Sequence, residues 1–152
     1  MPLSHMGKVY RKGKGFTFVE VRMPAFHRTM DRISAETSRI VSITGHDNGT
    51  EIEVFYHFII KGHLWCAKFR IPRNNPSMPT AVGYFPAASL YERETHEMLG
   101  IDFKGNRNLD NILLDKELSP KKPLRKVSSK GGLRPGYPLK KEEVVKNEKT
   151  RK

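Results

Sequence analysis

Two runs of alternating residues, Glu51–Ile59 and His63–Ile71, constrain the fold of this chain more than any other feature. The apolar positions of the first run are Ile52, Val54, Tyr56 and Phe58. The second run has Trp65, Ala67, Phe69 and Ile71 on one side and Leu64, Cys66, Lys68 and Arg70 on the other. Alternation with period two is typical of strands with one buried face. Because Lys61-Gly62 can turn the chain between them, the sequence predicts an antiparallel pair that faces the core.

Neighbouring segments extend this sheet. Ser38–Thr44 reads as another strand, and the turn Gly45–Gly49 contains Asn48-Gly49, a dipeptide that favours tight hairpins. These segments predict a three-stranded antiparallel meander. Phe16–Val21 alternates in the same way and is predicted to be a further strand, which Pro24 ends.

Two helices are predicted. The first covers Ala25–Glu36, with Pro24 in its first turn. Its apolar residues recur at helical spacing: Phe26, Met30 and Ile33. The second opens at Pro86, and its apolar face is predicted to contain Ala87, Leu90, Tyr91, Glu94 and Met98. Glu92, Arg93 and His96 are expected on the outward side, and Gly100 is placed to end the helix in a left-handed cap.

Glu94 is the unusual residue of this second helix. A carboxylate among apolar neighbours must find a donor, because an unpaired buried charge costs several kcal/mol. We therefore expect Glu94 to act as an internal or intersubunit ion-pair anchor. Arg93 and Glu97, four residues apart, are expected to pair on the exposed flank.

The remaining segments carry weaker patterns. Pro72–Pro79 is rich in turn residues and is predicted to be a loop, while Ala81–Phe85 fits a short strand or an extended lead into the helix. After Gly105, one further turn of apolar packing is expected from Leu109, Ile112, Leu113 and Leu114. The predicted fold is α+β: a mostly antiparallel sheet with two principal helices packed on it, and an extended basic C-terminal tail.

Charge supports a division of the chain into three parts. The net charge is +12, but residues 1–15 contribute +4 and residues 119–152 contribute +9, which leaves −1 for 16–118. We expect a flexible basic lead (1–15), one core domain (16–118) and a tail rich in Pro, Gly and Lys (119–152). The basic ends suit an acidic partner or anionic lipid. A free-standing nucleic-acid-binding domain remains the alternative that the total charge suggests.

Candidate chemical sites are few. His63 and Cys66 could form half of a zinc site, but no second pair of Cys or His has suitable spacing. His96-Glu97 lacks the second histidine of a zinc protease motif, because position 100 is glycine. Glu92, Glu94 and Glu97 suggest either acid/base chemistry or a structural ion network. With no nucleophile or phosphate-binding loop beside them, we favour the ion network.

Other features bear on the cellular environment of the chain rather than on a chemical site. The single cysteine, Cys66, fits a reducing environment, and within an apolar strand it is expected to be packing rather than a nucleophile. The strand aromatics are expected to pack in the core rather than to stack on bases. No run approaches the roughly 20 apolar residues of a membrane-spanning helix, and we expect a chain that is soluble or peripheral through a partner. The many Lys, Arg and Glu residues are compatible with a thermophilic source.

A continuous motif around the second helix resembles a known family. The run Glu92-Arg93-Glu94-Thr95-His96-Glu97-Met98-Leu99-Gly100-Ile101, followed by Phe103, Gly105 and Ile112-Leu113, resembles the signature of the complex I thirty-kilodalton subunit, the C-subunit family of NADH dehydrogenase. Further residues match the same family: Tyr56-His57-Phe58, Pro86 and Pro123-Leu124-Arg125-Lys126. The resemblance covers about residues 16–126. Asn106-Arg107 stands where respiratory members usually have histidine and proline, and Asp110 stands where a basic residue or proline is usual. These departures point to the subunit of archaeal membrane-bound group 4 nickel-iron hydrogenases or their sulphur-reducing relatives.

The resemblance implies a scaffolding subunit with no catalytic residue of its own. It implies no cofactor on this chain, with iron-sulphur clusters and nickel-iron carried by partner subunits. The implied partners are the large catalytic subunit and the small iron-sulphur subunit, on the cytoplasmic side of the membrane, with the membrane arm reached indirectly and no nucleic acid. The residues expected at subunit interfaces or in the structural signature are Tyr91, Glu92, Arg93, Glu94, His96, Glu97, Gly100, Phe103, Gly105, Asn106, Arg107, Pro123, Leu124, Arg125 and Lys126.

Overall fold

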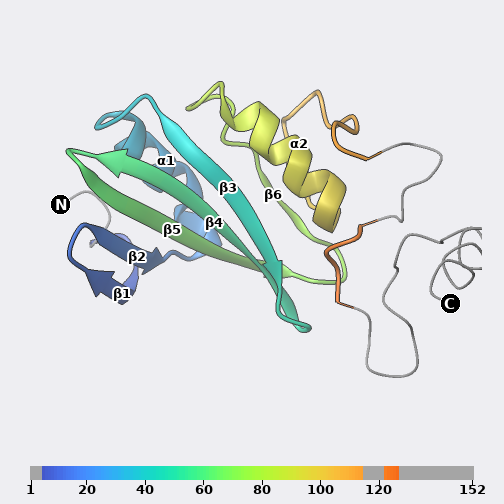
Figure 1. The fold of residues 1–152 in the computed structure, drawn as a ribbon, viewed down its shortest axis with the longest axis horizontal. Coiled ribbons are helices and arrows are strands. Elements are labelled where there is room, and N and C mark those ends of the chain that lie inside the picture. Colours follow the sequence, from blue (N-terminus) through green and yellow to red (C-terminus); the bar gives the residue numbers. More distant parts are fainter. Residues whose placement is uncertain (1–4, 115–121, 127–152) are drawn as a thin grey trace, which may run out of the picture.

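Seven strands and two α-helices make up the described part of the chain, residues 5–114 and 122–126 of the computed structural model (Figure 1). In chain order the elements are β1 Lys8–Gly13, β2 Phe16–Glu20, the 3-10 helix η1 Met23–Ala25, α1 Phe26–Ser34, β3 Ile40–Asp47, β4 Glu51–Ile60, β5 His63–Pro72, β6 Ser77–Pro79, α2 Ala88–Leu99 and β7 Asp102–Lys104. The predicted α+β class is confirmed. The predicted tail lies outside the described residues, except for 122–126.

The main sheet has five strands in the order β1-β2-β5-β4-β3. The predicted meander β3-β4-β5 is antiparallel throughout, and its turns lie at Asn48-Gly49 and Lys61-Gly62, where Gly49 and Gly62 have positive φ. On the other side of β5, β2 pairs in the parallel direction. Helix α1 supplies the crossover that a return from β2 into the same sheet requires.

Strand β1 corrects the expectation of a flexible basic lead. Lys8–Gly13 pairs antiparallel with β2, although most of its side chains are exposed. Tyr10 holds it in place, because its ring lies 6.0 Å from that of Phe18 and the Lys68 ammonium sits 4.4 Å from the Tyr10 centroid. Backbone pairing and these ring contacts, rather than apolar burial, order the strand, so counting apolar residues missed it.

Both helices cover one face of the main sheet, which we call the inner face. The stripe predicted for α1 is confirmed, since Phe26, Met30 and Ile33 are at most 1% exposed. Phe26 contacts the inward-facing Tyr56, with ring centroids 5.9 Å apart. Helix α2 crosses β3 at Gly45, where an added Cβ would lie 2.3 Å from Leu99 Cδ1. A side chain at position 45 would therefore require the end of the Leu99 side chain to move.

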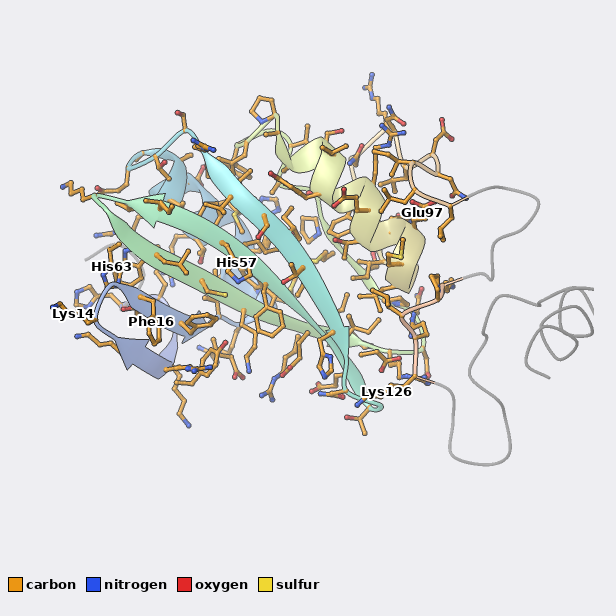
Figure 2. All side chains as sticks on the ribbon, viewed as in Figure 1. Lys14, Phe16, His57, His63, Glu97 and Lys126 are labelled. Carbon is orange, nitrogen blue, oxygen red and sulfur yellow. The ribbon has the colours of Figure 1, made fainter. Side chains whose placement is uncertain are left out.

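The opposite face of the sheet carries aromatic side chains that neither α1 nor α2 covers. Cross-strand register places residues of β2, β4 and β5 side by side on this face, and Tyr10 of β1 joins them through its ring contact with Phe18. We call this set the open face: Tyr10, Phe16, Phe18, Phe55, His57, Ile59 and Leu64. Phe16 and His57 both project from it (Figure 2). The expectation that the strand aromatics are core residues is thus right for Tyr56, Phe58, Phe69 and Trp65 and wrong for the open face.

A second, two-stranded sheet forms where a loop was predicted. Ser77–Pro79 (β6) pairs in parallel with Asp102–Lys104 (β7), and Met78 and Phe103 bury their side chains there. Ala81–Phe85 is neither a strand nor an extended lead, because the amides of Tyr84 and Phe85 both bond to the carbonyl of Ala81 in a turn. Ile112 and Leu113 are 37% and 59% exposed, so of the predicted extra apolar turn Leu109 alone packs against the core.

Candidate interaction site around helix α2

The buried face of α2 differs from the predicted one. Ala88, Glu92, Thr95 and Leu99 are at most 5% exposed, whereas Leu90 is 46% exposed and Glu94 is only partly buried. The predicted face is therefore rotated by roughly 100° about the helix axis. The error arose because two buried positions are polar: Thr95 bonds back to the carbonyl of Tyr91 at 2.7 Å, and Glu92 is satisfied by loops. Among residues 5–114 and 122–126 Glu94 has no ion-pair partner within 4.0 Å, so it is not the internal anchor, and its role between subunits stays a prediction.

Glu92 is the carboxylate of α2 that lies fully buried. It accepts hydrogen bonds from the Thr80 hydroxyl at 2.6 Å, the Ala81 amide at 2.6 Å and the Asn106 side-chain amide at 3.0 Å. Burial raises the pKa of Glu92, and these three donors act against the rise. Its two oxygens tie α2 to the segments that follow β6 and β7. Asn106 is one of those donors.

Glu97 makes a second link, to the segment beyond β7. Its oxygens accept the backbone amides of Ile112, Leu113 and Leu114 at 3.2, 3.0 and 2.7 Å. Burial alone would raise the pKa of Glu97, but these amides and the positive charge of Arg93 lower it below the usual value. Arg93 does not form the predicted ion pair, since it donates instead to the carbonyl of Asp110 at 3.2 Å.

The helix ends as predicted at Gly100. With φ at 67°, Gly100 takes the left-handed conformation and donates its amide to the carbonyl of His96 at 2.6 Å. The His96 ring donates from Nδ1 to the carbonyl of Ile101 at 2.8 Å, which fixes its tautomer because a carbonyl only accepts. His96 therefore faces the turn after the helix rather than open solvent.

Residues 122–126 clamp the C-terminal end of α2 to the β3–β4 hairpin. Arg125 donates to the carbonyls of Leu99 at 2.6 Å and Arg73 at 2.8 Å. The side chain of Asp47, which is fully buried, accepts the Lys126 amide at 3.0 Å and Arg73 Nε at 3.0 Å. A cation at a helix C-terminus also interacts favourably with the helix dipole. Figure 2 shows Glu97 on α2 and Lys126 near the hairpin end of the sheet.

Sequence reasoning missed Asp47, Arg73 and Thr80 as members of this site. Asp47 precedes Asn48-Gly49 and also accepts the amide of Gly49 at 2.9 Å, so the turn pattern could have drawn attention to it. Burial raises the pKa of Asp47, but the bonds from Gly49, Lys126 and Arg73 together lower it below the usual value. Arg73 and Thr80 lie in an irregular stretch and carry no comparable signal.

The other predicted signature residues serve mainly as packing and turns. Tyr91 packs at the edge of the core, Phe103 is buried, and Gly105 has φ at 97° with Thr80 Cγ2 at 3.0 Å from where a Cβ would stand. Arg107 is exposed, Pro123 is partly buried and Leu124 is 58% exposed. The Leu124 amide bonds to the carbonyl of Met98 at 3.1 Å. The structure therefore gathers most of the predicted residues around one helix.

The side chains of this site hold segments of the chain in position. Within residues 5–114 and 122–126, potential metal ligands do not gather in groups of three or more. His63 instead shares a hydrogen bond of 2.9 Å with Thr17, and burial raises the pKa of Cys66 to about 12. Two open hollows of about 440 and 420 Å³ border Arg28 of α1 rather than the carboxylates. None of the helices in the described part of the chain is long and apolar enough to span a membrane.

Comparison with known proteins gives a consistent result. The family described as the respiratory-chain NADH dehydrogenase, 30 Kd subunit, matches residues 19–132. The C subunit of the F(420)H(2) dehydrogenase of Methanosarcina mazei is 33% identical over 97 residues, which cover 61% of each chain. The C subunit of the NADH-quinone oxidoreductase of Roseiflexus castenholzii is 40% identical over 76 residues, 49% of this chain and 43% of the relative.

A solved structure also matches. It is that of the membrane-bound sulfane sulfur reductase, an archaeal respiratory membrane complex, and one of its chains is 27% identical with a TM-score of 0.63. The match covers 94% of this chain and 82% of that one. By contrast, this chain spans only 61% and 43% of the length of the two curated relatives.

Proposed function

The chain belongs to the respiratory-chain NADH dehydrogenase 30 kDa subunit family, and from this premise we propose that it is a non-catalytic assembly subunit of a membrane-bound, ion-translocating oxidoreductase. It lies in the peripheral arm on the cytoplasmic side, held to the membrane through its partners. The complex is hydrogenase-like or sulphur-reducing. The similarity to a chain of the sulfane sulfur reductase and the Asn106-Arg107 departure both favour that branch.

The proposed partners are the large catalytic subunit and the small iron-sulphur subunit. Electrons pass through these neighbours from ferredoxin or a similar donor, and this chain holds them in register. Its own part requires no cofactor. The relatives named above are subunits of an F(420)H(2) dehydrogenase and an NADH-quinone oxidoreductase, so the family occurs with different electron donors.

The observation that carries the proposal is the state of the three buried carboxylates. Glu92, Glu97 and Asp47 each accept at least three hydrogen bonds from the chain's own donors. A catalytic acid or base must lie within hydrogen-bond distance of a substrate proton. These carboxylate oxygens instead accept hydrogen bonds that hold loops against α2. Such an arrangement supports a rigid positioning role.

Removal of the chain tests the proposal. In cells that make the complex, deleting this subunit should release the large and small subunits from the membrane fraction, while each still binds its own metal. The measurement is quantitative mass spectrometry of membrane and soluble fractions. A complex that assembles fully and stays on the membrane without the chain would contradict the proposal.

The basic C-terminal segment is proposed to lie along the partner subunits. The clamp at 122–126 allows a sharper deletion than removal of the whole of 119–152, because deleting 127–152 leaves Arg125 and Lys126 in place. The shorter deletion should keep the thermal stability of the chain and lower the recovery of the large subunit. Full recovery of the large subunit would show that the anchoring role of the tail is wrong.

A further inference from the structure

The open face is more aromatic than a solvent-facing sheet surface needs to be. Five rings form a branched cluster across β1, β2 and β4, in which Phe18 contacts three of the others and contacting centroids lie 5.8 to 6.5 Å apart. The rings are those of Phe16, Phe18, Tyr10, His57 and Phe55. Exposed apolar groups gathered on one surface mark interaction sites more often than scattered ones do.

Aliphatic residues extend this surface. Ile59 lies directly across from Leu64, which in turn lies across from Phe16, and Ile59 is 52% exposed. Beneath them Cys66 is fully buried. Burial lowers the pKa of His57, so this ring adds no charge to the face at neutral pH. The centre of the face is therefore apolar and uncharged.

The charges around this centre are unevenly matched. At one end, Lys68 pairs with Glu20 at 2.9 Å and with Glu53 at 3.3 Å, and Arg70 adds contacts to the same carboxylates. At the β1 edge, Arg11 and Lys14 are exposed, and neither is among the ion pairs within 4.0 Å found in residues 5–114 and 122–126. The Arg11 guanidinium lies 5.7 Å from the centroid of the Phe16 ring. Lys12 lies across from Thr17 and therefore belongs to the other side of the sheet. The unmatched charge of this face is positive and lies on one side.

This pattern distinguishes between two kinds of partner. An anionic membrane would meet the cations of β1 but would also face Glu20, Glu51 and Glu53 on the same sheet surface, which it repels. A protein surface can instead place apolar side chains against the rings and carboxylates only opposite β1, as interfaces with an apolar centre and a polar rim do.

We infer that the open face docks a partner subunit of the same complex, through a surface with apolar side chains at its centre and carboxylates opposite Arg11 and Lys14. The inference rests on the proposed function and adds the surface and the chemistry of contact. It also accounts for the ordered β1 strand, which carries Arg11 at the edge of the face.

A labelling experiment on the assembled complex tests the inference. Ile59→Cys places a thiol in the open face, and Ala35→Cys, at the exposed end of α1, is the control. Native Cys66 stays silent because it is buried with a pKa of about 12. Reaction of Ile59→Cys with a maleimide should slow by about tenfold or more on going from the free chain to the complex, because interface centres exclude water. Ala35→Cys should change by less than about twofold, since it lies outside the proposed surface.

Charge reversal supplies the second measurement. The double variant Arg11→Glu with Lys14→Glu should lower recovery of the partner subunits, whereas Arg28→Glu on α1 should leave it unchanged. Circular dichroism and melting temperature of each variant check that the fold is kept. Equal loss in both variants would overturn the charge pattern.

The outcomes separate the inference from the proposed function. If no other protein of the complex co-purifies with the unmodified chain, the proposed function fails and the inference fails with it. If a complex is recovered but Ile59→Cys reacts as fast as in the free chain, only the docking face is wrong. Protection of Ile59→Cys by a second copy of the chain alone, or by vesicles containing phosphatidylserine, would likewise overturn the choice of partner.

Discussion

Both faces of the central sheet carry aromatic side chains, but only those of the inner face are covered by helices of the same chain. Along β4, Tyr56 and Phe58 point inward and are completely buried, while the residues between and beside them, Phe55, His57 and Ile59, point to the open face. The inner face is closed by α1 and α2 of the same chain. The inner aromatics therefore stabilise the fold of the chain. The outer aromatics, by the inference above, contact a partner subunit.

The largest expected effect is a difference in stability between the two faces. Phe58→Ala should lower the free energy of unfolding by about 4 kcal/mol, because it opens a cavity in the closed core. Phe55→Ala, the matched change on the open face, should lower it by only about 1 kcal/mol, since its ring is already partly in water. Urea unfolding of both variants measures this. Equal losses would show that the open face belongs to the folding core.

The next effect concerns Asp47, which joins residues 122–126 to the end of the β3–β4 hairpin. Asp47→Ala should lower the free energy of unfolding by about 3 kcal/mol, because it leaves the Arg73 guanidinium and the Gly49 and Lys126 amides without their acceptor. Asp31→Ala, on the exposed side of α1, is the control and should change it by less than about 0.5 kcal/mol. Urea unfolding reports the difference, and a loss at Asp47 no larger than that at Asp31 would contradict the clamp.

A smaller effect distinguishes the two glutamates of α2. Glu92→Gln should lower the free energy of unfolding by about 2 kcal/mol, because an amide cannot accept all three donors that converge on the carboxylate. Glu94→Gln should change it by less than about 0.5 kcal/mol, since Glu94 is partly exposed on the outward side. Thermal and urea unfolding compare the pair. A larger loss for Glu94→Gln would restore the face predicted from the sequence.

The smallest effect is a dependence on pH at Glu97. Because its folded pKa lies below the usual 4.5, its bonds stabilise the fold above pH 4.5, and this contribution is lost as the pH falls through the folded pKa. The raised pKa of Glu92 acts in the opposite sense, since protonation there favours the folded state. Glu97→Gln should therefore reduce stability at pH 7 and flatten its decline in acid. Unfolding curves between pH 3 and 7 measure both slopes, and a variant that declines as steeply as the unmodified chain would contradict this assignment.

The sequence was most informative where one physical rule decided the outcome. Alternation from Glu51 to Ile71 and the two glycine-containing turns are enough to define the meander, because a one-residue slip would expose the whole apolar set. Gly100 could be assigned as a cap since only a left-handed residue ends the helix there. The family resemblance, read over about residues 16–126, agrees with the match at 19–132.

The errors occurred where polar groups or backbone pairing replace apolar burial. The face of α2 was misassigned because Glu92 and Thr95 are buried and satisfied by partners distant in sequence or by the helix itself. Strand β1 was missed because its stability comes from pairing with β2 and from the Tyr10 contacts. The aromatics of the open face were predicted to be core residues. Alternation shows that the two faces of a strand differ, but it does not show what covers each face.

The central claim is that this chain is an assembly subunit, and purification of the tagged chain from its native membrane tests it most directly. The account predicts that the large catalytic and small iron-sulphur subunits co-elute with it in equal amounts, and that the metal remains with them when the chain is separated. Elution of the chain alone as a monomer, or bound to nucleic acid with a steep dependence on salt, would contradict the account.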